Sequence, residues 1–171
     1  MNPTPIPTAI RAGAVLALIA VLFGFVLGGL FGLNEDAVKG RLEASGSAVI
    51  ATVYQGDVAA KDAVVAKSWD YLKRAHMHGG GIGAAALGAI AMIVLMTGMG
   101  TIARLSAVSI GAGAIVYSVF WLLAGFMAPG HGGTDAAKEA LEWIAVPGAG
   151  LALMGVVGSL FAVIRDRRVN S

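Results

Sequence analysis

Four stretches of the chain contain no acidic, basic or histidine residue, and this pattern restricts the fold more than any other feature. They cover residues 12–32, 79–101, 105–129 and 143–164. Each supplies the roughly 20 apolar residues that an α-helix needs to cross a hydrocarbon core about 30 Å thick. Backbone N–H and C=O groups cannot stay unpaired in lipid, so each stretch must be helical. We therefore predict an all-α integral membrane protein with four transmembrane helices.

The composition agrees with a chain whose main solvent is lipid. Of 171 residues, 57% are hydrophobic and only 13% are charged, too few to give every helix the polar face that a water-soluble domain needs. The absence of cysteine excludes disulfides and thiolate metal sites. A net charge of +2 does not indicate a nucleic-acid partner. We expect a single membrane domain over residues 1–171.

The side of the membrane that holds the termini is rich in arginine. An even number of spans puts both termini on this side, where one acid, Asp166, accompanies a group of basic residues: Arg11, Arg104, Arg165, Arg167 and Arg168. The total count of lysine and arginine on the two sides is ambiguous, but the dense basic flanks favour cytoplasmic termini. We therefore expect a multi-pass protein of the bacterial inner (cytoplasmic) membrane with both termini in the cytoplasm.

The connection over residues 33–78 is the only sizeable extramembrane piece. Asn34 is suited to an N-cap, and 55–57 (Gln-Gly-Asp) is typical of a turn. Apolar residues recur at helical spacing on both sides of this turn: Val38, Leu42, Val49, Val53 and Tyr54 before it, and Val58, Val65, Trp69 and Leu72 after it. We predict an amphipathic helical cap between the first and second spans, which either covers the bundle or lipid surface or docks a partner protein.

Small residues recur every four positions within the first two spans. The glycines of this pattern are Gly24, Gly28 and Gly32 in the first span and Gly79 and Gly83 in the second. Such spacing lets helix backbones approach closely, which matters because lipid offers no hydrophobic drive for helix association. We expect these glycines to serve both packing within the bundle and association with other membrane subunits or a second copy of the chain.

The three histidines are predicted to lie in one layer at the outer face. His76 and His78 precede the second span and His131 follows the third, with Met77 and Met127 beside them. Imidazole suits copper and haem iron, and thioether sulfur favours Cu(I), so these five residues form a candidate metal site. On an unbroken helix only one of His76 and His78 could join His131, because positions i and i+2 point apart. The segment 74–78 resembles the His-x-His helix starts of some bacterial haem and copper membrane proteins.

The spans themselves contain no ionisable side chain, and this bears on function. Ion pathways and proton relays need such groups inside the bundle, and we therefore do not expect an enzyme acting alone. The expected function is a non-catalytic accessory subunit or assembly partner of a larger membrane complex, with a copper or haem site at the outer face. Two alternatives stay open: a transporter or channel for a small neutral solute, and a haem-carrying redox subunit.

Overall fold

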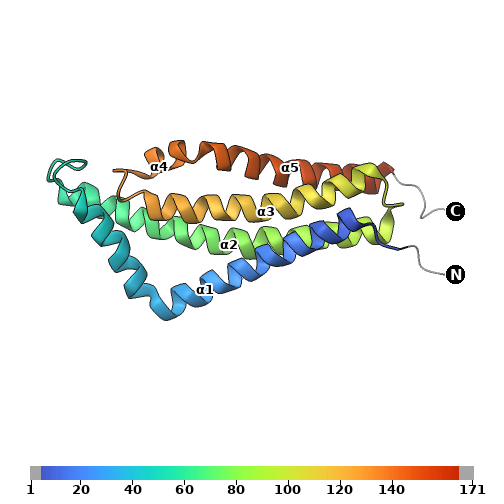
Figure 1. Ribbon diagram of the computed structural model, residues 1–171, viewed down its shortest axis with the longest axis horizontal. Helices are drawn as coiled ribbons and strands as arrows, with labels where there is room; N and C mark the ends of the chain where they lie inside the picture. Colours follow the sequence, from blue (N-terminus) through green and yellow to red (C-terminus); the bar gives the residue numbers. More distant parts are fainter. Residues whose placement is uncertain (1–4, 166–171) are drawn as a thin grey trace.

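The computed structural model describes residues 5–165, and five α-helices make up most of this range (Figure 1). They are α1 (Thr8–Ala48), α2 (Val58–Met96), α3 (Thr101–Met127), α4 (Thr134–Ala140) and α5 (Glu142–Arg165). Four of them, all except α4, are long and apolar enough to cross a membrane. The predicted all-helical architecture with four apolar helices of spanning length is thereby confirmed.

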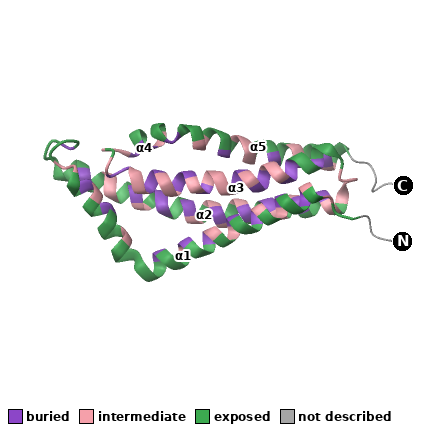
Figure 2. Cartoon of the chain, viewed as in Figure 1, coloured by how far each residue is buried: buried purple, intermediate pink, exposed green. Residues whose placement is uncertain are grey.

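The helix α3 lies at the centre of the arrangement and packs along α1, α2 and α5 (Figure 1). The most apolar 18-residue stretch of α3 is 44% buried inside the protein. The corresponding stretch of α5 is only 17% buried, because α5 packs mainly on α3. Figure 2 shows the same contrast, with buried residues concentrated along α2 and α3 and exposed residues on the outer sides of α1 and α5. The fold therefore depends on what α3 presents to each neighbour.

Glycine allows the helices to meet backbone to backbone. A Cβ atom added to Gly24 of α1 would overlap the backbone of Gly80 in α2. Likewise, a Cβ on Gly13 of α1 would overlap Ala107 of α3. The small-residue pattern in the first span thus serves packing inside the chain, as the sequence predicts for one of its two uses.

The helix α1 changes direction at Asn34, where its ribbon turns back toward the start of α2 (Figure 1). Asn34 has non-helical dihedral angles, φ −133° and ψ 30°. Its side-chain Nδ2 donates to the backbone carbonyl oxygen of Leu30 at 3.4 Å. The predicted helical pair is therefore the second half of α1 and the first half of α2, continuous with the spans and not a separate element. The buried Lys61 of α2 joins the two halves by an ion pair with Glu43 of α1, and it also pairs at 3.0 Å with Asp62 of its own helix.

The first of these halves is shorter than the sequence pattern suggests. The apolar stripe continued to Tyr54, but α1 ends at Ala48 and turns occupy the next residues. The predicted turn at 55–57 is confirmed, because Gln55 and Gly56 both have positive φ, 54° and 84°. At the other end of α2, the helix stops at Met96, short of the predicted limit at residue 101, and four residues separate it from the start of α3 at Thr101. We call the end of the bundle where α2 passes into α3 the terminal end, and the opposite end the loop end.

Tyr54 holds the loop end together. Its hydroxyl donates to the carbonyl oxygen of Pro129, in the segment between α3 and α4, at 2.7 Å. Burial raises the pKa of the Tyr54 hydroxyl above the ordinary value of about 10, so it remains a donor through the neutral range. The neighbouring Val53 packs where a side chain on Gly132 would stand. The two connections are thus locked to each other.

We expect Tyr54→Phe to lower the free energy of unfolding by about 1–2 kcal/mol, because the buried carbonyl of Pro129 loses its donor. The measurement is thermal or denaturant unfolding of the detergent-solubilised protein by tryptophan fluorescence. Thr52→Val, which removes an exposed hydroxyl bonded only to Val49 within its own turn, should change stability far less. Equal effects of the two changes would refute the locking role of Tyr54.

Candidate functional site

His76 faces α1 and helps to hold α1 to α2. Its Nδ1 donates to the carbonyl oxygen of Gly24 at 2.7 Å. The ring lies directly over Gly28, where an added Cβ would come within 2.6 Å of Cε1. The imidazole therefore occupies the space that a side chain at position 28 would need. The α1–α2 contact requires glycine there.

His78 faces the opposite way, toward α3. Its ring stacks on Tyr117 with centroids 5.2 Å apart and an interplanar angle of 29°. It also lies 5.9 Å from the ring of Trp121. The divergence of His76 and His78 is the one expected of positions i and i+2 on a helix.

His131 lies apart from both. It follows the end of α3, is exposed, and donates from Nδ1 to the carbonyl oxygen of Met127 at 3.0 Å. Met127 is ten residues beyond Tyr117, the residue that contacts His78, and this corresponds to about 15 Å along the axis of α3. Imidazole–metal bonds are only about 2.0–2.1 Å long, so His78 and His131 do not share an ion in this arrangement.

The candidate metal site is thus not assembled as the sequence analysis expected. Met77 is 57% exposed on the outer side of α2, and Met127 packs at the edge of the hydrophobic core. Within residues 5–165 no three histidine, aspartate or glutamate side chains are grouped so that they could hold a metal ion. The structure places the three histidines against α1, against α3 and in a loop, which leaves copper or haem binding a prediction without a shared ligand set.

In place of that site, the structure assembles a cluster around Trp121, which we call the Trp121 cluster. Its members come from one face of α2 and one face of α3: Tyr71, Arg74, His78, Tyr117 and Trp121. Tyr71 meets Trp121 edge to face at a centroid distance of 4.8 Å. The Arg74 guanidinium carbon lies 5.0 Å from the Trp121 ring and 5.2 Å from the Tyr71 ring, within cation–π range.

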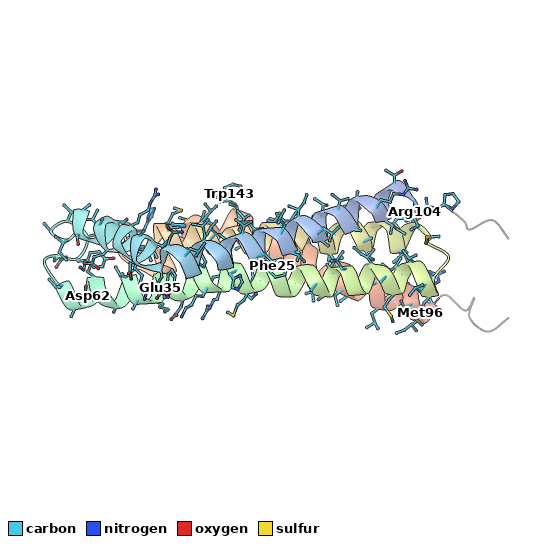
Figure 3. All side chains as sticks on the ribbon, turned by 90° about the horizontal axis from the view of Figure 1, so that it is seen from below. Phe25, Glu35, Asp62, Met96, Arg104 and Trp143 are labelled. Carbon is cyan, nitrogen blue, oxygen red and sulfur yellow. The ribbon has the colours of Figure 1, made fainter. Side chains whose placement is uncertain are left out.

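Trp121 itself carries the one unusual polar group of this cluster. Its indole Nε1 is buried and, within the part of the chain that the structure describes, has no hydrogen-bond partner. An indole N–H can only donate, so this position can serve a carbonyl, carboxylate or water oxygen. Of the three tryptophans, only Trp143 is largely exposed, at 72% (Figure 3).

The sequence analysis missed this cluster, although a signal for it is present. Tyr71, Arg74 and His78 stand at i, i+3 and i+7, the spacing of one helix face. Tyr117 and Trp121 stand at i and i+4 in the third apolar stretch. Their meeting depends on the relative depth of α2 and α3, which no spacing within one helix can give.

We expect Gly28→Leu to destabilise the protein by about 2–3 kcal/mol, because its side chain must displace His76 and break the bond to Gly24. The adjacent Gly29→Leu is the matched control, since an added Cβ there meets no atom within 4 Å. Thermal unfolding in detergent measures both.

The double variant Gly28→Ala with His76→Ala should be more stable than the sum of the two single changes predicts, because removing the ring makes room for the new methyl group. Additive effects in this cycle, or equal losses for Gly28→Leu and Gly29→Leu, would contradict the assigned contact.

Known proteins offer no relative from which to assign a role. No family model matches the chain, and no curated protein and no solved structure matches it either.

Proposed function

We propose that the protein is a non-catalytic accessory subunit or assembly partner of a larger complex in the bacterial inner membrane. The observation that carries the proposal is an outward face of α2 made of small residues: Gly81, Ala84, Ala85 and Gly88. All four are exposed, and they stand at i, i+3, i+4 and i+7, so they share one side of the helix. A face of this kind lets the backbone of another helix approach closely.

The contrast with the other outer helices supports this choice of face. On α1 the outward positions carry large side chains such as Leu22, 61% exposed, and Phe25, 69% exposed. On α5 they include Leu153, 65% exposed. Large apolar side chains suit contact with lipid chains, whereas a small-residue face gains little from lipid and more from a second helix.

The glycines expected to mediate association divide into two groups. Side chains added to Gly24, Gly28, Gly79 or Gly83 would collide with atoms of the same chain. Gly32 has no atom within 4 Å of an added Cβ and remains open, as do Gly81 and Gly88. We therefore assign association with a second chain to the open group.

The extramembrane helical segments supply a second part of the proposed docking surface. The first half of α2 and the second half of α1 border an open groove of about 680 Å³, lined by charged residues and by the ring of Trp69. Lys39 stands 5.3 Å above that ring, and Glu43 and Asp70 line the same groove. A mixed-charge, partly aromatic surface of this kind suits a polar protein segment better than a lipid surface.

Replacing both Gly81 and Gly88 by leucine should reduce the partner-bound or oligomeric form by about tenfold or more, because the bulky side chains prevent close helix approach. The measurement is native gel electrophoresis and copurification from native membranes in mild detergent. Gly150→Leu, at an open glycine of α5, is the control for added bulk. Unchanged mobility of the double variant, with a wild-type complex present, would sink the accessory-subunit proposal for this face.

The orientation that we propose has both termini in the cytoplasm. Among the described residues, the terminal end carries Arg11, Arg104 and Arg165 and no acid, whereas the acids gather toward the loop end, as Figure 3 illustrates with Glu35 and Asp62. The loop end also carries seven lysines and arginines, so the total count does not decide the orientation; the basic flanks of the apolar helices at the terminal end favour the cytoplasm for that end. A cytoplasm-active reporter fused after Ser171 should be functional, and the same reporter inserted at Gly56 should be silent. The reverse pattern would invert the topology.

A further inference from the structure

The three arginines of the terminal end lack carboxylate partners in the described chain. Every ion pair found within residues 5–165 joins residues of the loop end, and none includes Arg11, Arg104 or Arg165. Arg104 is partly engaged, because its Nε donates to the carbonyl oxygen of Met99 at 2.8 Å. The sequence places one acid, Asp166, beside the arginines of this end, so positive charge is in excess there. An excess of positive charge at one end of a set of apolar helices attracts anions from the adjacent membrane surface.

A pocket opens at this end between the start of α3 and the last turns of α5. Its volume is about 400 Å³, within the roughly 300–1,000 Å³ typical of small-ligand sites. Its lining combines polar side chains, Thr97 and Thr101, with apolar ones, including Ile102 and Phe161. The pocket therefore suits a ligand with a polar head and an apolar body.

Arg165 places a cation at this pocket. It lines the cavity from the last turn of α5, and its guanidinium carbon lies 5.8 Å from the ring of Phe161. A guanidinium can donate two parallel hydrogen bonds to phosphate oxygens, and its aliphatic stem can lie along apolar surface while the head stays at the membrane boundary. Thr97 is less available, since its hydroxyl already donates to the carbonyl oxygen of Ile93 at 2.7 Å.

We propose that this pocket binds one anionic phospholipid. Its phosphate would bind Arg165, and an acyl chain would lie against the apolar lining residues Ile102 and Phe161. Exposed apolar side chains stand three positions beyond lining residues on the same helices: Leu105, 64% exposed, after Ile102, and Ile164, 71% exposed, after Phe161. Positions i and i+3 are neighbours on a helix, so this is an apolar continuation of the pocket lining. A soluble anion would use the cation but not this apolar continuation. The charge of the terminal end and the shape of the pocket thus select the same occupant.

The test is lipid binding to the purified full-length chain by native mass spectrometry, with phosphatidylglycerol as the probe and phosphatidylcholine as the neutral comparison. We expect Arg165→Gln to weaken retention of phosphatidylglycerol by about tenfold, and Arg11→Gln, which removes the same charge at the same end, to change it little. Equal losses for the two variants would overturn the proposal, because general surface charge would then explain the binding. Equal retention of phosphatidylcholine would overturn it as well.

A second variant separates shape from charge. Ile102→Trp should fill the pocket and reduce phosphatidylglycerol retention without altering any charge, whereas Leu153→Trp, at an exposed position of α5 that does not line the pocket, should not. Displacement of the lipid by excess inorganic phosphate would identify a plain anion site and refute a phospholipid site. These measurements need no partner subunit, so their outcome is independent of the association proposed for α2.

Discussion

Close contact between helix backbones is the constraint on which the rest of this structure depends. Lipid gives apolar side chains no reason to leave it, so helices associate through packing and polar contacts alone. Here the packing is provided where Gly13 of α1 meets α3 and where Gly155 of α5 meets Ile110 of α3. At each point a methyl group would force the helices apart. The central position of α3 follows, because it also presents its own glycines to all three neighbours: Gly111 to α1, Gly125 to α2 and Gly113 to α5.

One polar side chain is built into this packing on the N-terminal side of the change of direction at Asn34. His76 donates a hydrogen bond to Gly24 and fills the space over Gly28. It therefore holds α1 to α2 just before α1 changes direction at Asn34. The Trp121 cluster occupies the same level on the α3 side. The two sets of contacts connect three helices near the boundary between apolar and charged sequence, and the long helices continue beyond it toward the loop end (Figure 1).

The sequence predicts the helices well and their relative depth poorly. Uncharged runs identify the four apolar helices because unpaired charge is costly in lipid. The same reasoning places His131 beside His78, since it takes the end of the third apolar run as the membrane surface. In the structure, the last turns of α3 are covered by protein: Gly125 packs against Leu72 of α2. An apolar run reports that water is excluded, and either lipid or neighbouring helices can exclude it.

The dependence of α5 on α3 has a consequence for the order in which the molecule is assembled. The chain is synthesised from its N-terminus, so α1 and α2 are available to pair through Gly24 and Gly79 before α3 is complete. When α3 enters, one of its sides meets α1 and α2 at once, but the side around Gly113 stays bare until Ala152 of α5 arrives. During that interval the half-built protein presents the uncovered backbone of Gly113 to the membrane, where another helix could take the place of α5.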